Sequence, residues 1–181
     1  MKLLVTRHGE TPWNRENWVL GRTDIPLNET GRAQALKLRE RLEGRHIDAV
    51  YVSPLSRTME TASIALEGRD LALVPEPRII EMDFGDFEKA GRRDPEYNEA
   101  KRRYFRRLPG GGESVMDLAA RIYPYIRELA RKHRGQTVLL VTHGGIARVI
   151  RSYFTGMDNE EFSSFFLENC GLLEYNVPEE D

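Results

Sequence analysis

Two uninterrupted apolar runs constrain the fold of this chain more than any other feature of its sequence. Leu3–Val5 and Val138–Val141 contain no polar residue, and Asp48–Val52 reads similarly. Unbroken runs are typical of strands in a parallel sheet that is covered on both faces. Amphipathic helical patterns fall between and after these runs, over Asn28–Leu42, Leu55–Leu66 and Ser114–Arg131. This alternation predicts an α/β fold with three layers, α/β/α, around a mostly parallel central sheet.

The rest of the chain supplies the sheet edges and one insertion. Leu71–Val74 is expected to be a short edge strand, because prolines follow at positions 75 and 77, and Gly171–Val177 is expected to be the last strand. Segment 82–113 is predicted to form a small helical lid. Within it, Arg92–Arg107 contains seven basic and three acidic residues, which suits either a solvated surface helix or a basic lid over an anion. A chain of 181 residues without an internal linker suits one domain, spanning 1–181.

Composition excludes several classes of protein. The 27 Lys and Arg residues nearly balance the 29 Asp and Glu residues, so the chain as a whole lacks the positive charge of a nucleic-acid-binding domain. No apolar run approaches the ~20 residues that a membrane-spanning helix needs, and the N-terminus has no signal-peptide core. The lone cysteine, Cys170, rules out an internal disulfide or a multi-cysteine zinc site. We therefore expect a cytoplasmic protein with no nucleic-acid or membrane partner.

Cationic residues follow three of the predicted strands. Arg7 and His8 come after the first strand, Arg57 after the second, and His143 after the strand near residue 140. Because the carboxyl ends of parallel strands meet at one edge of a sheet, these side chains are expected to share a cleft. Burying such a set is costly unless an anion compensates it, and guanidinium groups match phosphate oxygens two at a time. The predicted helix that opens at Gly144 adds backbone donors, so the expected ligand is a phosphate group.

His8 is the candidate nucleophile. A neutral imidazole attacks phosphorus effectively, and phosphoryl transfer then depends on in-line positioning and on neutralising the charge of the equatorial oxygens. Arg7, Arg57 and His143 are suited to that neutralisation. The side-chain amide of Asn14 is a further candidate donor.

A leaving alkoxide needs a proton, so a general acid is expected opposite the nucleophile. Glu81 is the candidate, because its apolar neighbours in Ile79–Met82 favour a protonated carboxyl group. Asp83 and Glu88 are alternatives for this part, and Glu81 would otherwise pair with an arginine.

Motifs in order along the chain resemble those of the histidine phosphatase superfamily, also called phosphoglycerate mutase-like. The motifs are Thr6–Thr11 with Asn14, Gly21–Leu27 leading to Gly31, Ser53–Thr58 with Glu60–Ala62, and Thr142–Gly145. The resemblance covers nearly the whole chain and implies the phosphoglycerate mutase-like fold. It implies that His8 becomes phosphorylated and that Glu81 donates the proton. It further implies a phosphate pocket completed by Arg7, Arg57 and His143, backbone donors around Leu20, Gly21 and Asn14, and no metal or other cofactor.

The sequence departs from the family pattern after Glu81. Many family phosphatases have Gly-x-Trp-Glu-Gly there, whereas residues 85–89 are Gly-Asp-Phe-Glu-Lys, a difference that bears on the shape of the adjacent loop and not on the chemistry. Pro109–Ser114 resembles a Pro-Gly-Gly-Glu-Ser segment of small family phosphatases, including α-ribazole phosphatases, which makes Glu113 a candidate substrate contact. Arg102 and Arg103 resemble the arginine pair with which the family's mutases hold a substrate carboxylate.

The predicted function is hydrolysis of the phosphate monoester of a small metabolite, by a monomer or homodimer. Cofactor-dependent phosphoglycerate mutase chemistry is the alternative, although the chain is short where the mutases carry an insertion that helps exclude water. A non-catalytic phosphate-binding module is the alternative from another class, and the presence of both nucleophile and acid opposes it. A metal site built from His8, Glu10 and His143 is opposed by the two adjacent arginines.

Overall fold

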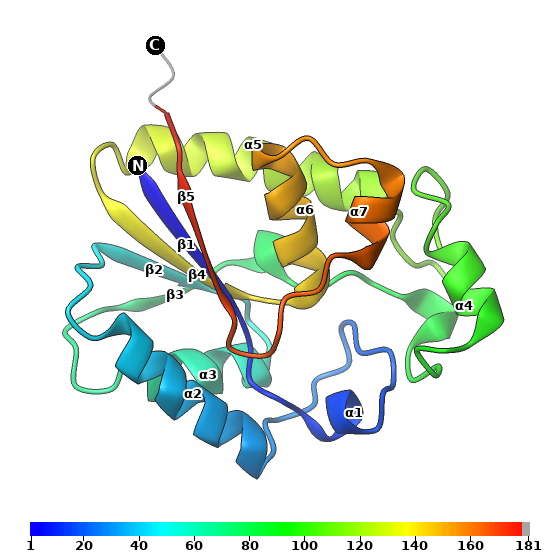
Figure 1. Ribbon diagram of the computed structural model, residues 1–181, viewed down its shortest axis with the longest axis horizontal. Coiled ribbons are helices and arrows are strands. Elements are labelled where there is room, and N and C mark those ends of the chain that lie inside the picture. The colour runs from blue at the N-terminus through cyan, green and yellow to red at the C-terminus, as the bar shows by residue number, and fades with distance from the viewer. Residues whose placement is uncertain (179–181) are drawn as a thin grey trace.

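A five-stranded sheet, in the order β3-β2-β4-β1-β5, forms the centre of the computed structural model, which describes residues 1–178 (Figure 1). Its strands are β1 (Lys2–Arg7), β2 (Ala49–Val52), β3 (Leu73–Pro75), β4 (Thr137–Thr142) and β5 (Leu172–Asn176). The pairs β1–β4, β4–β2 and β2–β3 are parallel, and β5 runs antiparallel beside β1. The prediction of a mostly parallel sheet is confirmed. Residues 179–181 of the predicted domain lie outside the described part.

Helices cover both faces of the sheet, which confirms the three layers (Figure 1). The pair on one face is α2 (Glu29–Leu42) and α3 (Ser56–Ala65), and the pair on the other is α5 (Val115–Lys132) and α6 (Gly144–Phe154). Leu3 and Val5 pack with α5 and α6, whereas Leu4 packs with α2 and α3. Because successive side chains of a strand point to opposite faces, a strand covered on both sides favours apolar residues at successive positions.

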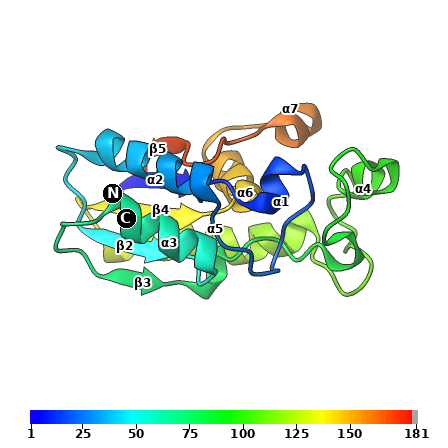
Figure 2. The same ribbon diagram turned by 90° about the horizontal axis from the view of Figure 1, so that it is seen from below.

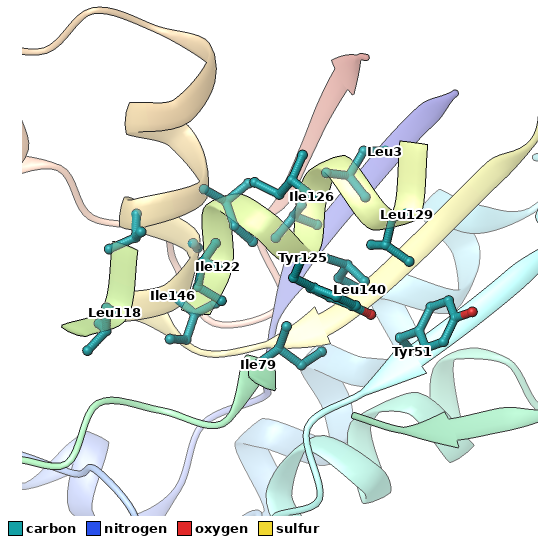
Figure 3. Packing of buried hydrophobic residues seen from close by; sticks show 14 of the residues in the cluster. Leu3, Tyr51, Ile79, Leu118, Ile122, Tyr125, Ile126, Leu129, Leu140 and Ile146 are labelled. Atoms are coloured by element: carbon teal, nitrogen blue, oxygen red, sulfur yellow. The ribbon is translucent and has the colours of Figure 1, made fainter. Parts of the chain in front are cut away.

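The larger core lies between the sheet and α5 (Figure 3). Leu118, Ile122, Ile126 and Leu129 recur every three or four residues along α5 and are almost completely removed from solvent. They belong to the same cluster as Leu3 and Leu140 of the two central strands. Burying one side chain of this size contributes roughly 1.5–3 kcal/mol, so this face of α5 holds the helix over β1 and β4.

Short helical elements occupy the connections. They are α1 (Pro12–Arg15), η1 (Pro77–Ile79), η2 (Gly85–Phe87), α4 (Pro95–Ala100) and α7 (Asn159–Ser164). Segment 82–113 contains η2 and α4 and extends beyond the end of the sheet (Figure 2). The edge strand β3 begins two residues later than predicted. The helix α7 has no predicted counterpart, because Phe162 is its single buried residue and leaves no periodic pattern. Across residues 1–178, no helix is long and apolar enough to span a bilayer.

The chain leaves β1 and β4 toward opposite faces of the sheet. β1 is followed by α2 on one face, whereas its parallel neighbour β4 is followed by α6 on the other. Such a divergence opens a crevice at the carboxyl ends of the two strands. A ligand site is therefore expected where Arg7 and Thr142 lie side by side.

A hydrogen-bonded network ties the C-terminus of α5 to β2. Lys132 Nζ donates to Tyr51 Oη over 2.8 Å, and Tyr51 Oη lies 2.9 Å from His133 Nε2. His133 Nδ1 lies 2.7 Å from the side-chain oxygen of Gln136, which can only accept. Nδ1 therefore carries the proton, and the Tyr51 hydroxyl donates to Nε2.

Replacing Tyr51 by Phe should lower the free energy of unfolding by roughly 1–2 kcal/mol, because the buried His133 Nε2 loses its donor. Tyr125→Phe is the matched control: its hydroxyl is buried and has no hydrogen-bond partner among the described residues, so the change should stay within about 0.5 kcal/mol. Urea denaturation followed by circular dichroism measures both variants. Equal destabilisation by the two would show that the network adds nothing to the packing of the ring.

Candidate active site

His8 and His143 lie side by side because their strands pair in register. Arg7 at the end of β1 stands opposite Thr142 at the end of β4, and the His8 backbone N–H continues the ladder by donating to Thr142 O over 3.0 Å. The two imidazole rings are buried, with their centroids 5.2 Å apart and their planes at 60°. The predicted convergence of the two histidines is therefore present.

The environment of His8 leaves one ring nitrogen available for attack. Its Nδ1 lies 2.7 Å from Gly9 O, and because a carbonyl oxygen can only accept, Nδ1 carries the proton and Nε2 keeps its lone pair. Burial lowers the pKa of His8 well below 6.5, and the charges of Arg57 and Arg7 add to this. His8 is therefore a neutral imidazole at neutral pH. Asn169 fixes its backbone by donating from Nδ2 to His8 O over 2.9 Å.

His143 is held by a residue that the sequence did not single out. It is the N-cap residue of α6, and its Nε2 lies 2.7 Å from the hydroxyl of the buried Ser53. His143 Nδ1 is buried without a partner among residues 1–178. Burial, followed by the charge of Arg57, holds the pKa of His143 well below 6.5, so this ring is also neutral. Nδ1 is therefore the ring nitrogen that is left for a ligand.

Arg7 and Arg57 are buried cations held by carbonyl oxygens. Arg7 Nη1 donates to Leu167 O over 2.9 Å, and Arg57 donates to Thr23 O and Gly21 O over 2.9 and 2.6 Å. Burial lowers the pKa of each to about 10, which leaves both charged at neutral pH. The Nε atom of each is buried and has no partner in the described part of the chain. Two such charges, with donors left over, fit a bound anion.

Glu81 lines the same cavity as Arg7 and His8. Its two carboxylate oxygens accept from the backbone N–H groups of Met82 and Gly145, over 2.9 and 3.1 Å. A Cβ atom at position 145 would lie 2.5 Å from Glu81 Oε1, so the carboxyl group reaches the start of α6 only because this residue is glycine.

The alternative acids are engaged elsewhere. Glu88 accepts from the Arg22 N–H and the Thr23 hydroxyl, over 3.0 and 2.9 Å. Asp83 accepts from the Gly85 N–H over 2.9 Å and lies 3.6 Å from an Arg22 nitrogen. Neither residue lines the cavity that holds His8, so Glu81 is the acidic side chain placed to reach a ligand there.

Three further predicted contacts are arranged as expected around the cavity, and one is set back from it. Asn14, Leu20 and Gly144 line the cavity, whereas Gly21 does not line it and instead accepts from Arg57 through its carbonyl oxygen. Asn14 Oδ1 is occupied by the Thr11 N–H of a capping box, which leaves the Nδ2 end as the group available to a ligand.

Glu113, Arg102 and Arg103 lie away from the cavity, contrary to expectation. Glu113 links neighbouring segments of the fold, because its carboxylate accepts from Arg22, from Arg121 and from the Asp83 N–H, over 3.1, 3.2 and 3.0 Å. Arg103 pairs with Glu99 on the exposed surface, and Arg102 borders a separate surface depression. The turns that follow α4 point both arginines outward. Cations at other positions line the cavity instead, namely Arg92, Lys101 and Arg148.

The departure at residues 85–89 is accommodated by the backbone. Lys89, where the family pattern has glycine, adopts the left-handed region with φ of 65°. Two backbone hydrogen bonds hold this loop against Val19. The Lys89 N–H donates to Val19 O over 3.0 Å, and the Val19 N–H donates to Ala90 O over 2.8 Å. The Lys89 ammonium lies 4.9 Å from the centroid of the Trp18 ring.

No group of three or more His, Cys, Asp or Glu residues in the described part of the chain is arranged to hold a metal ion. In particular, Glu10 does not join His8 and His143, because its carboxylate accepts from Asn28 Nδ2 over 2.8 Å.

Known proteins resemble this chain in both sequence and fold. Residues 3–181 match the family model of the histidine phosphatase superfamily, branch 1. The chain is 34% identical to phosphoserine phosphatase 1 of Hydrogenobacter thermophilus, over 99% of this chain and 88% of the relative. It is 33% identical to the 2,3-bisphosphoglycerate-dependent phosphoglycerate mutase of Bartonella bacilliformis, over 88% of this chain and 84% of the relative.

A solved structure agrees with these matches. The crystal structure of a putative alpha-ribazole-5'-P phosphatase from Escherichia coli superposes with a TM-score of 0.85 at 28% identity, covering 96% of this chain and 89% of that chain. The family model, the relatives and the solved structure thus agree with one another. The chain belongs to the histidine phosphatase superfamily, branch 1.

Proposed function

We propose that the protein hydrolyses phosphate monoesters through a phosphohistidine intermediate on His8. The observation that carries this proposal is a neutral imidazole, with Nε2 unprotonated, next to two buried arginines, neither of which forms an ion pair with a carboxylate of residues 1–178. Relatives and structural neighbours named as phosphatases support it.

The first step transfers the phosphoryl group to the protein. His8 Nε2 attacks phosphorus in line with the ester oxygen, and the N–P bond forms as the P–O bond breaks. Arg7 and Arg57 neutralise charge on the equatorial oxygens, and the neutral His143 donates a hydrogen bond to one of them from Nδ1. Glu81 in its protonated form gives its proton to the departing alkoxide.

The second step returns the protein to its starting state. Water attacks the phosphohistidine, Glu81 takes a proton from that water, and the N–P bond breaks to release inorganic phosphate and neutral His8. No step requires a metal ion, so activity is expected to persist in excess EDTA. The substrate is a small phosphorylated metabolite, and the protein acts in the cytoplasm as a monomer or homodimer.

Return of the phosphoryl group to a substrate is the second candidate, because one relative is a phosphoglycerate mutase at 33% identity. Incubation with 3-phosphoglycerate and a bisphosphoglycerate primer separates the two reactions. A hydrolase releases inorganic phosphate, whereas a mutase converts 3-phosphoglycerate into its 2-phospho isomer.

His8→Ala should abolish the acid-labile, base-stable label that a ³²P-phosphate monoester leaves on the protein, because the attacking nitrogen is removed. The measurement is rapid quenching in excess EDTA followed by denaturing electrophoresis. His46→Ala is the matched control, since His46 is exposed and pairs with Asp48, and it should keep the label. A label that persists in the His8 variant would contradict the assignment of the nucleophile.

Glu81→Gln should reduce kcat/KM about 10²–10⁴-fold for an alkyl phosphate and less than ~10-fold for p-nitrophenyl phosphate, because only the poor leaving group needs a proton. Steady-state kinetics on both esters gives the two losses. Asp83→Asn is the comparison, and it should leave the ratio between the esters as in the wild type. Equal losses on both esters in the Glu81 variant would argue against proton donation.

His8 and His143 should remain neutral as the pH falls from 7 to 6, with the His8 proton on Nδ1. The pKa values of both histidines in the folded protein lie below 6.5, so the unfolded chain takes up protons at a higher pH than the folded protein does. The contribution of the neutral rings to the free energy of unfolding is therefore complete above about pH 6.5. It decreases as the pH falls toward the pKa values of the folded protein. Nitrogen-15 spectra of the histidine-labelled protein, assigned with His8→Asn and His143→Asn, test this. Conversion of either ring to imidazolium above pH 6 would refute it.

A further inference from the structure

The cavity next to His8 carries more positive charge than one phosphate group compensates. Besides Arg7, three cations line it, namely Arg92, Lys101 and Arg148. Glu81 is the only acidic residue among the described residues that line it. A phosphate monoester brings a charge of about −1.5 to −2 at neutral pH, which leaves two or more of these cations uncompensated.

The three additional cations are held by neutral groups. Arg92 Nε donates to Trp18 O over 3.2 Å, and Arg148 donates from Nε and Nη2 to Phe165 O over 3.2 and 2.9 Å. The Lys101 ammonium lies 5.5 Å from the centroid of the Tyr97 ring. None of the three is in an ion pair with a carboxylate of residues 1–178, in contrast to Arg22, Arg78 and Arg121 outside the cavity.

Lys101 and Arg148 approach the cavity from different walls. Lys101 follows α4 in the inserted segment, whereas Arg148 stands on α6, four residues after Gly144 and therefore on the same face of that helix. Burial lowers the pKa of Lys101, and Arg148 is the largest of the charges that add to the effect. The pKa of Arg148 is also lowered by burial. Holding these like charges together costs free energy that a second anion would offset.

Part of the cavity wall is apolar and aromatic. Its residues include Phe84, Phe162, Phe165 and Phe166, with Tyr97 beside Lys101. Phe162 also faces the Arg148 guanidinium, whose carbon lies 5.7 Å from the ring centroid. Such a wall suits a carbon framework that joins two anionic groups.

We propose that Lys101 and Arg148 form a second anion subsite, so that the substrates are phosphate monoesters whose leaving group carries a carboxylate or a second phosphate on an apolar framework. This inference rests on the proposed hydrolysis at His8. It places the subsite on residues other than Arg102 and Arg103, which point away from the cavity.

Binding of non-hydrolysable phosphonates tests the subsite separately from catalysis. (3-Carboxybenzyl)phosphonate and (3-carbamoylbenzyl)phosphonate have nearly the same shape and differ by one negative charge. Isothermal titration calorimetry on the wild type should give at least tenfold tighter binding of the carboxylate. A third compound, 1,3-bis(phosphonomethyl)benzene, distinguishes a second phosphate from a carboxylate by which of the two binds more tightly.

Lys101→Met should reduce the carboxylate-to-carboxamide ratio of Kd values from tenfold or more to less than threefold. Arg148→Gln should do the same, and its melting temperature shows whether the loss of the Phe165 contact has disturbed the fold. Lys37→Met, which removes one exposed positive charge on α2, is the matched control and should keep the wild-type ratio.

Equal affinity of the wild type for the carboxylate and the carboxamide would overturn the subsite. A preference that survives both Lys101→Met and Arg148→Gln would overturn its assignment to these residues. Neither result depends on turnover, so failure of the subsite is distinguishable from failure of the hydrolase proposal, which the release of phosphate from p-nitrophenyl phosphate measures.

Discussion

The parallel pairing of β1 with β4 is the constraint on which the candidate site depends. Its register sets Arg7 opposite Thr142, the last residues of the two strands. The residue that follows each strand is a histidine, and the two histidines therefore lie side by side. The end of β2 lies next to these two strand ends. The Ser53 N–H donates to Val141 O near the end of β4, and the Ser53 hydroxyl is hydrogen-bonded to His143 Nε2. Ser53, His143 and His8 thus come from three neighbouring strand ends. A slip of one residue would turn each strand's side chains to the opposite face, so the core that fixes the register also fixes the chemistry.

The positive charge at these strand ends has two effects that act together. Arg7 and Arg57 are buried and donate to carbonyl oxygens, with no carboxylate of residues 1–178 in an ion pair with either, which costs free energy in the absence of an anion. The same charges, added to burial, keep His8 and His143 unprotonated. A cluster that attracts phosphate therefore also keeps the nucleophilic nitrogen free of a proton. Placing a carboxylate beside each arginine would relieve the cost, but it would weaken both effects.

Much of this arrangement is predictable from the sequence, because burial on both faces of a strand leaves unbroken apolar runs. Strand ends then locate Arg7, His8, Arg57 and His143. Side chains on the short elements are harder to place: α4 has six residues, too few for a pattern, and the turns after it decide that Lys101 faces inward while its neighbours Arg102 and Arg103 do not. Arg148 did have a usable signal, since it stands one helical turn after Gly144 on α6. Ser53 had one too, in its position directly after the strand that ends at Val52.

The placement of His8 depends on two glycines, Gly9 and Gly31, which have no side chain. A Cβ atom on Gly9 would lie 2.4 Å from Gly31 O, and one on Gly31 would lie 2.2 Å from Glu10 O. The loop after β1 thus packs backbone to backbone against the start of α2, and the lack of a side chain at Gly9 allows this contact. The Gly9 N–H also donates to Thr61 Oγ1 on α3 over 3.0 Å. Contacts with α2 and α3 thus fix Gly9, whose carbonyl oxygen accepts the hydrogen bond from His8 Nδ1. In-line attack requires a nucleophile held in one orientation, and these two glycines allow the loop to be packed closely enough to hold it.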